Sequence, residues 1–412
     1  MSRFARFAGV LVVLAAALVA CGQDRHPVLT VVGSDLPFDE PLHLRAAGLG
    51  PGDRVTIGAS LTDEQHHRWQ SRATYVADGR GRLDLDRDRP RTGKFRDADS
   101  MGLFWTLAPS DQDAPFTLPA ASRVTLTVVE DGTTLVRRTV VRRTSAPGIR
   151  RTALTVQRDG IDGVYFQPAQ AARPRPALLI FGGSEGGLGS TLLARMLATH
   201  GYPTLRIAYF GEPGLPRELR EVPVEYGGRA VRYLSRQPGV DPHRVVVMGA
   251  SRGSELAELL GVHYPDLVHG VVALTPANVA GAGSKGVGSA WTWHGRPVPY
   301  TRQFNQSAPT DNPDAVIPVE RTAGPVLATC GGMDQVWVSC DYATAIMRRL
   351  DAHHHGYPDR MLRYPDAGHY SNGVLPYDPL PWDPQAEADQ KARVSEYHAL
   401  RNWLSALPAG SD

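Results

Sequence analysis

The sequence predicts two domains: an all-β immunoglobulin-like sandwich, followed by a mostly parallel α/β sheet with helices on both faces. The first observation is length, because 412 residues exceed what one hydrophobic core usually serves. The second is a series of short strand patterns over residues 28–145, separated by turn signals. The third is the alternation of strand and helix patterns over residues 150–408, which is typical of parallel sheets.

The expected strands of the first domain are short segments with alternating or β-branched character. Glycine- and aspartate-containing turns separate them, as at Asp78-Gly79-Arg80-Gly81 and Asp131-Gly132. We expect strands at residues 28–32, 42–45, 54–59, 73–76, 124–129 and 134–142. No residue cluster in this region resembles a catalytic group.

A change of pattern at Ser145-Ala146-Pro147-Gly148 opens the second domain. The first two of its strands are expected to form an antiparallel pair, and right-handed crossovers should make most of the others parallel. We expect strands at residues 152–156, 164–167, 177–181, 204–208, 245–248, 270–274, 326–329 and 360–363. We expect helices at residues 191–199, 224–236, 342–350 and 386–407.

The amino terminus has the pattern of a bacterial lipoprotein leader. Arg3 and Arg6 precede an apolar run over residues 8–20, which is too short for a membrane-spanning helix. The run ends in Leu18-Val19-Ala20-Cys21, which resembles a lipobox. We expect a signal peptide at residues 1–20, lipidation of Cys21 and a tether over residues 21–27. The alternative is an ordinary cleavage site with an incidental cysteine.

An exported, lipid-anchored chain would stand at the outer face of the cell membrane, where disulfides persist. The sequence contains three cysteines, so Cys330 and Cys340 remain once Cys21 is set aside. We expect a disulfide between these two, closing the intervening loop. The alternative is a pair of buried free thiols.

Composition excludes several classes of partner. The chain is 42% hydrophobic and 21% charged, which is ordinary for a globular protein. Its net charge of +2 gives no reason to expect nucleic acid or electrostatic membrane binding. His66-His67 lacks a third ligand nearby in the sequence, so neither a metal site nor a cofactor is expected.

The stretch around Ser251 is the strongest chemical signal. A run of β-branched apolar residues leads into Gly249-Ala250-Ser251-Arg252-Gly253, and residues that favour a helix follow. A Gly-x-Ser-x-Gly motif between a strand and a helix strains the turn and lifts the serine hydroxyl above the sheet. Within a parallel sheet this is the signature of an α/β-hydrolase, with Ser251 as nucleophile. The alternative is a serine that merely caps the helix.

That fold places an acid and then a histidine on loops that follow later strands. Asp334 and His369 each come directly after such a strand. We expect His369 to take the proton of Ser251, and Asp334 to hold the imidazole tautomer and stabilise its charged form. The rejected rivals are Asp341 in the first turn of the next helix, Asp366 because it is too near the histidine, and His353, His354 and His355, expected in solvent at a helix end.

An oxyanion hole needs backbone donors near the serine. One donor is expected to be the N–H of Arg252, the residue after the nucleophile. The other should come from the loop Gly182-Gly183-Ser184-Glu185-Gly186-Gly187. We expect the N–H of Ser184 or Glu185 to serve, and the sequence leaves that choice open.

Several motifs in order make the chain similar to a known family, the acyl-CoA thioesterase and bile acid-CoA:amino acid N-acyltransferase (BAAT) family. The likeness covers nearly everything after Pro27. In the first domain it rests on Trp69-Gln70-Ser71-Arg72-Ala73-Thr74-Tyr75 and Asp99-Ser100-Met101-Gly102-Leu103-Phe104-Trp105. In the second it rests on residues 182–187 and 249–253, Ile317-Pro318-Val319-Glu320 and Gly332-Met333-Asp334-Gln335-Val336-Trp337.

The resemblance implies a triad of Ser251, Asp334 and His369 that acts on acyl thioesters through an acyl-serine intermediate. Family members that transfer acyl groups to amino acids tend to carry cysteine at the nucleophile position, so Ser251 favours water as the acceptor. Acyl-CoA is a cytoplasmic metabolite, whereas the leader predicts that the protein is exported. An exported carboxylesterase or amidase therefore remains an alternative, as does a non-catalytic envelope binding protein on the same fold.

Residues 277–312 are glycine-rich at first and then carry Trp291, Trp293 and Tyr300. The stretch lies between two expected strands, where hydrolases often place a cap over the acyl pocket. A mobile surface loop is the other interpretation.

Lipidation of Cys21 is directly testable. Cells expressing the full chain should incorporate a radiolabelled or clickable fatty acid into it, and the Cys21→Ser chain should incorporate none, because the lipid is attached through the thiol. The measurement is label per mole of immunoprecipitated protein. Continued labelling of Cys21→Ser would contradict the prediction.

Overall fold

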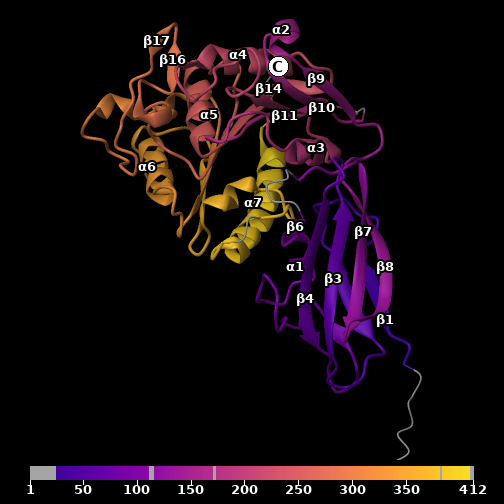
Figure 1. Ribbon diagram of the computed structural model, residues 1–412. Coiled ribbons are helices and arrows are strands. Elements are labelled where there is room, and N and C mark those ends of the chain that lie inside the picture. Colours follow the sequence, from indigo (N-terminus) through magenta and orange to yellow (C-terminus); the bar gives the residue numbers. More distant parts are fainter. Residues whose placement is uncertain (1–24, 111–115, 170–172, 381–382, 409–412) are drawn as a thin grey trace, which may run out of the picture.

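The computed structural model describes residues 25–110, 116–169, 173–380 and 383–408. An amino-terminal β domain and a larger α/β domain lie side by side, with the long final helix between them (Figure 1). The expected signal peptide and Cys21 fall outside the described residues. None of the helices within those ranges combines the length and the apolar character that a membrane crossing requires.

The amino-terminal domain packs two antiparallel sheets against each other. The first has the order β1-β2-β5, and the second β6-β4-β3-β7-β8. Inward and outward side chains alternate along the strands, so that Leu44, Ile57 and Leu126 are fully buried between the sheets. The bounds are β1 Val28–Val32, β2 His43–Ala47, β3 Arg54–Thr62, β4 Arg68–Val76, β5 Leu83–Asp84, β6 Ala108–Pro109, β7 Ala121–Glu130 and β8 Thr133–Arg143, with a one-turn helix α1 at Gly102–Trp105.

The expected strands lie in the right places, but several are longer than their apolar residues suggested. β3 and β4 form a hairpin whose register runs from Arg54 opposite Val76 to Thr62 opposite Arg68. Polar residues fill the solvent side of the added length. They belong to the strands because the backbone hydrogen bonds of the pair continue, which apolar periodicity does not reveal.

The second domain is built on one sheet with the order β19-β18-β15-β14-β11-β12-β10-β9. β10 pairs antiparallel with both β9 and β12, and the remaining neighbours are parallel. The expected antiparallel opening pair is therefore confirmed. The bounds are β9 Arg150–Leu154, β10 Asp162–Gln167, β11 Arg175–Phe181, β12 Thr204–Ala208, β14 Val240–Ala250, β15 Val271–Leu274, β18 Val326–Gly331 and β19 Arg360–Tyr364.

Helices cover both faces of this sheet (Figure 1), and alternate residues of its strands decide which helix each face meets. Leu178 and Met248 belong to the core shared with α3, α7 and the β sandwich. Leu179 and Val247 belong to the core shared with α4, α5 and α6. The helices are α2 Val156–Asp159, α3 Leu192–Thr199, α4 Val224–Ser235, α5 Arg252–His263, α6 Ser339–Ala352 and α7 Ala386–Ala406.

Shorter elements complete the chain. A small sheet of order β13-β16-β17 lies at one end of the α/β domain, and Figure 1 labels β16 and β17 on the orange projection there. Its strands are β13 Val222–Pro223, β16 Trp291–Trp293 and β17 Arg296–Pro297. The 3₁₀ turns are η1 Ser284–Gly286, η2 Pro313–Ala315, η3 Val319–Arg321 and η4 His369–Gly373.

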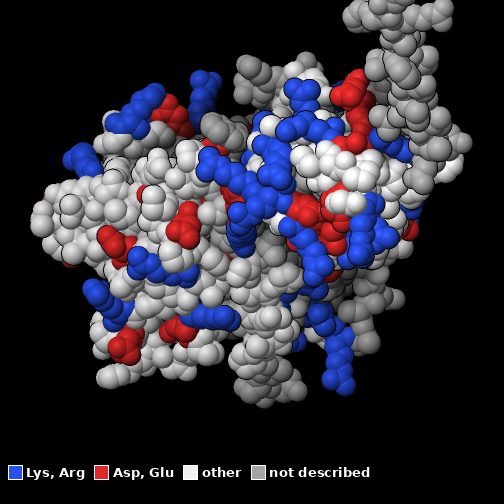
Figure 2. All heavy atoms as spheres, turned by 90° about the horizontal axis from the view of Figure 1, so that it is seen from below, with Lys and Arg blue, Asp and Glu red and all other residues white. Residues whose placement is uncertain are grey.

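Charged side chains of both signs meet water on the molecule. In the face seen in Figure 2, blue basic groups crowd the centre and red acidic groups lie among them. One surface pair of this kind joins Arg143 to Asp35, whose side chains are 46% and 56% exposed. Such pairs contribute little to stability, because water screens them and long side chains lose freedom on pairing.

The two domains meet through buried polar contacts as well as a shared apolar core. Asp39 of the sandwich is fully buried and pairs with His200, at the end of α3. Arg401 on α7 lies 3.9 Å from the same carboxylate. Burial by itself would raise the pKa of Asp39, but the hydrogen bond and charge of His200 outweigh it and lower the pKa.

Replacing Asp39 by alanine should destabilise the protein by about 3–5 kcal/mol, because a buried partner loses its counter-group. Thermal unfolding in the neutral range measures this. Because the pKa of Asp39 is lowered on folding, its contribution is present above the unfolded value and disappears as pH falls through the folded one. The control is Asp35→Asn, which removes one charge of an exposed ion pair and keeps a residue type that tolerates the left-handed backbone at this position. It should change stability by less than about 1 kcal/mol. Equal effects of the two variants would refute the interpretation.

Candidate active site

Ser251 occupies a strained turn between β14 and α5. Its backbone has φ 53° and ψ −124°, a conformation that a residue with a side chain rarely adopts. The Ser251 N–H donates to Leu274 O at 2.9 Å, which fixes the turn to the neighbouring strand β15. Only 8% of the serine is exposed. The sequence analysis predicted this order of strand, turn and helix, although β14 begins at Val240, before the expected strand at residues 245–248.

The flanking glycines are required by close backbone approaches. A Cβ added to Gly249 would lie 1.9 Å from Gly253 O, and one added to Gly253 would lie 2.1 Å from Gly182 O. No side chain can occupy those positions without moving the backbone. The two glycines of the motif therefore bring strand β14, helix α5 and the loop after β11 within contact of one another.

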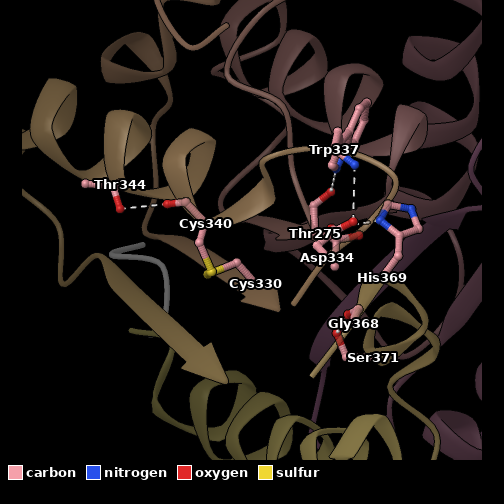
Figure 3. The surroundings of a disulfide bond; sticks show 9 residues. All are labelled: Thr275, Cys330, Asp334, Trp337, Cys340, Thr344, Gly368, His369 and Ser371. Carbon is pink, nitrogen blue, oxygen red and sulfur yellow. Dashed lines mark hydrogen bonds and ion pairs between the residues drawn. A yellow bond between two sulfur atoms is a disulfide. The ribbon is translucent and has the colours of Figure 1, made fainter. Parts of the chain in front are cut away.

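The predicted acid and histidine lie together. His369 Nδ1 is 2.8 Å from Asp334 Oδ2, and their side chains are only 9% and 2% exposed. The other carboxylate oxygen, Oδ1, accepts the N–H groups of Val336 at 2.9 Å and Trp337 at 3.2 Å. With Nδ1–H donated to the carboxylate, Nε2 is left as the basic nitrogen of the ring. Figure 3 shows the pair.

Trp337 is a part of this site that the sequence did not single out as functional. Its indole N–H donates to Thr275 O at 3.0 Å, and its ring stands edge-on to His369 with centroids 5.8 Å apart. Thr275 Oγ1 accepts the side-chain amide of Asn372 at 3.1 Å. The tryptophan thus braces the acid loop and covers one side of the imidazole (Figure 3). Its place three residues after Asp334 was the available signal.

Ser251 and His369 make no hydrogen bond to each other in the part of the chain described. Catalytic hydrogen bonds are often long or poorly aligned without substrate and tighten in the reacting complex. The serine and the Asp334–His369 pair come from separate elements, namely the β14–α5 turn, the loop after β18 and η4. Each of the three side chains is nearly buried.

A disulfide joins Cys330 to Cys340. Cys330 is in β18 and Cys340 is in the first turn of α6, so the bridge closes the loop that carries Asp334 (Figure 3). Cys330 is fully buried and Cys340 is 7% exposed. The cross-link restrains both ends of the acid loop, while Trp337 holds its middle.

The glycine-rich loop after β11 borders the serine. A Cβ on Gly183 would lie 3.0 Å from Ser251 Cβ. The Gly183 N–H is engaged by the carboxylate of Glu185 at 2.9 Å, which removes Gly183 as a donor. The amides of Ser184 and Glu185 make no hydrogen bond to another described group. As the first residue of α5, Arg252 has no intrahelical acceptor for its N–H.

A cavity of about 160 Å³ lies at the carboxyl ends of the strands beside the serine turn. Its apolar wall comes from Ile180, Met248 and Leu274. Three charged residues also line it, namely Glu185, Arg206 and Asp378. Burial lowers the pKa of Arg206 and raises that of Asp378 to about 6.

Part of the stretch over residues 277–312 packs against helix α5, whereas residues 294–297 and most of residues 302–306 are exposed. Glu255 on α5 accepts the indole N–H of Trp291 at 2.7 Å and the Gly281 N–H at 2.9 Å. The same carboxylate pairs with Arg252 at 2.6 Å, whose guanidinium also donates to Ala282 O. The free-energy cost of burying these two charges is offset because each has several hydrogen-bond or ion-pair partners.

The aspartates and histidines that were rejected as triad members take no part in the Asp334–His369 pair. Asp341 is in the first turn of α6, as expected. One expectation about the histidines was wrong: His355 is not in solvent, since its side chain is 3% exposed and contacts Asp359 at 2.7 Å. The chain folds back into β19 there, and Asp359 also accepts the Val326 N–H. This histidine therefore supports the sheet edge.

Two family models match the chain, one for each domain. The model described as Acyl-CoA thioester hydrolase/BAAT N-terminal region matches residues 39–156. The model described as BAAT / Acyl-CoA thioester hydrolase C terminal matches residues 222–287 and 292–391. The second match spans Ser251, Asp334 and His369.

Among similar curated proteins, acyl-coenzyme A thioesterase 1 of Rattus norvegicus is 31% identical over 373 residues, covering 83% of this chain and 84% of the relative. Acyl-coenzyme A thioesterase 1 of Homo sapiens is 29% identical over 404 residues, covering 89% and 93%. The human mitochondrial acyl-coenzyme A thioesterase 2 is 29% identical over 404 residues, covering 89% and 81%. With both domains, their order and the serine turn in agreement, the chain belongs to the acyl-CoA thioesterase/BAAT family.

Proposed function

We propose that the protein hydrolyses acyl thioesters through an acyl-Ser251 intermediate. The observation that carries the proposal is the buried Asp334–His369 pair, at 2.8 Å, in a chain whose family relatives are acyl-CoA thioesterases. The strained serine turn supplies the nucleophile. The family likeness supports the substrate class, and the geometry supports the mechanism.

The reaction proceeds in two acyl transfers. His369 Nε2 takes the Ser251 proton as Oγ attacks the acyl carbonyl, and Asp334 stabilises the imidazolium that forms. The N–H groups of Arg252 and of Ser184 or Glu185 hold the oxyanion. The carbon–sulfur bond breaks and the thiolate takes the proton from His369. Water then attacks the acyl-enzyme by the same route, which releases the acid and free serine.

The cavity beside Ser251 is proposed to receive the first part of the acyl group. Its volume of about 160 Å³ is below the roughly 300–1,000 Å³ of a site for a drug-sized ligand. Ile180, Met248 and Leu274 offer an apolar wall to the carbon chain. The thiol portion of the substrate would remain outside this cavity.

We further propose that the chain is exported and anchored by lipid at Cys21, outside the described residues. The disulfide between Cys330 and Cys340 supports this, since such bridges persist in oxidising compartments. In that location a carboxylester or amide of the cell envelope is a second candidate substrate. The same serine chemistry would serve, because only the leaving group differs.

A fluorophosphonate probe tests the nucleophile. The folded protein should be labelled at Ser251, and Ser251→Ala should take up no label, because phosphonylation needs an activated serine hydroxyl. Labelled-peptide mass spectrometry reads the site. Rates on an acyl-CoA series, p-nitrophenyl esters and anilides then rank the substrate classes. Absence of labelling in folded protein would sink the enzyme proposal and favour a binding protein.

Removing the disulfide should weaken the acid loop. In Cys330→Ala/Cys340→Ala the loop between residues separated by 10 positions loses its closure, which costs about 2–3 kcal/mol of stability. The phosphonylation rate should fall as Asp334 becomes less well held. Unfolding and labelling are measured with and without reducing agent. Reductant should lower the stability and the labelling rate of the native chain and leave both unchanged in the double variant. A native chain whose stability and labelling do not respond to reductant would contradict the prediction.

A further inference from the structure

Helix α7 contacts the chain on both sides of His369. Asp389 accepts the N–H of Gly368, the residue before the histidine. Arg393 Nε donates to the carbonyl of Tyr370, the residue after it, at 2.8 Å. The backbone N–H before His369 and the backbone carbonyl after it are therefore both hydrogen-bonded to side chains of the same helix.

These contacts share one face of the helix. Asp389 and Arg393 are four residues apart, about one helical turn, so their side chains point the same way. Asp389 is fully buried and Arg393 is 6% exposed. Arg393 also donates to Asp378 O at 3.4 Å, beyond the end of η4. A Cβ on Gly373 would lie 2.2 Å from an Arg393 nitrogen, so that glycine admits the guanidinium.

The two side chains carry opposite charges, and each suits its backbone partner: the N–H of Gly368 for Asp389 and the carbonyl of Tyr370 for Arg393. A carboxylate accepts a backbone N–H, and a guanidinium donates to a backbone carbonyl. Burial raises the pKa of Asp389 to about 6 despite the Gly368 hydrogen bond, and Arg393 counteracts this rise. Burying charged side chains costs desolvation free energy that an apolar side chain packed at the same position would not cost.

The helix that carries them is itself held in place. On its outer side Glu387 accepts the N–H groups of Arg96 and Asp97 from the sandwich domain. Lys391 pairs with the carboxylate of Asp97. Figure 1 shows α7 lying between the two domains. The contacts on the inner side therefore join η4 to a helix with a fixed position.

We propose that Asp389 and Arg393 are positioning residues, which clamp the backbone on each side of His369 and so hold its ring between Asp334 and Ser251. The assignment rests on the proposed role of His369 as the base. It adds a second support to the imidazole, independent of its bond to Asp334. Misplacement of a reacting group by about 1 Å can reduce rate about 100-fold, so loosening this clamp should affect chemistry before it affects binding.

The test compares Asp389→Ala, Asp389→Asn and Glu396→Gln in the full chain. Asparagine keeps an oxygen that can accept the Gly368 N–H, whereas alanine does not. Glu396 is the matched control: it is 1% exposed on the same helix, burial raises its pKa to about 8, and glutamine is close to it in shape. It makes no hydrogen bond to residues 368–370 within the described chain.

We expect Asp389→Ala to lower kcat and the phosphonylation rate by about 10- to 100-fold, with KM changed less than about twofold. Asp389→Asn should recover most of the loss. Glu396→Gln should stay within about twofold of the native rate. Thermal unfolding verifies that the compared variants are folded at the assay temperature. Equal rates for Asp389→Ala and Glu396→Gln, or no recovery by asparagine, would overturn the proposal.

A second measurement does not depend on hydrolysis. The low-field proton resonance of His369 Nδ1–H reports its bond to Asp334, and amide exchange at Gly368 reports the bond to Asp389. In Asp389→Ala the resonance should broaden or shift and the amide should exchange faster, with both signals native in Glu396→Gln. A native chain that fails to react with the probe would refute the enzyme function, whereas unchanged signals in Asp389→Ala would refute the clamp alone.

Discussion

The close backbone approach at the serine turn is the constraint on which the functional geometry depends. Gly249 meets Gly253, and Gly253 meets Gly182, at distances that exclude any Cβ. These contacts bring together the end of β14, the start of α5 and the glycine-rich loop after β11. Ser251 and the amides proposed to bind the oxyanion therefore lie on backbone segments in direct contact. The strain of the turn, visible in the positive φ of Ser251, is held by the parallel sheet below.

The other half of the site is assembled from longer-range supports. Asp334 stands on a loop closed by the Cys330–Cys340 bridge and braced by Trp337. The two residues that flank His369 are hydrogen-bonded to α7, which also contacts the sandwich domain. The β domain thus has a physical connection to the histidine through one helix.

Much of the site was predictable because it follows from chain order. A serine between a strand and a helix, an aspartate after a later strand and a histidine after the next one are fixed by how α/β units wind. The position of the glycine-rich loop beside Ser251 was predictable for the same reason. Trp337 and Asp389 were not, since nothing in their local sequence states which backbone groups they will meet. His355 was misplaced because a run of histidines at a helix end reads as solvent-exposed, whereas the return strand buries it.

The sequence by itself predicted the two domains, the order of their elements and the three side chains proposed as the triad, since these depend on periodicity and on local turn chemistry. Only the tertiary structure decided the length of the sandwich strands, the hydrogen bond from the Gly183 N–H to Glu185, and the hydrogen bonds of α7 to the residues on each side of His369. Those features join residues far apart in the chain. Their energies arise from burial and hydrogen-bond geometry, which exist only once the domains have packed. The Ser251 turn could be predicted from the sequence because its strand, its two glycines and its helix are adjacent in the chain, whereas its contacts with Leu274 and Gly182 appear only in the folded structure.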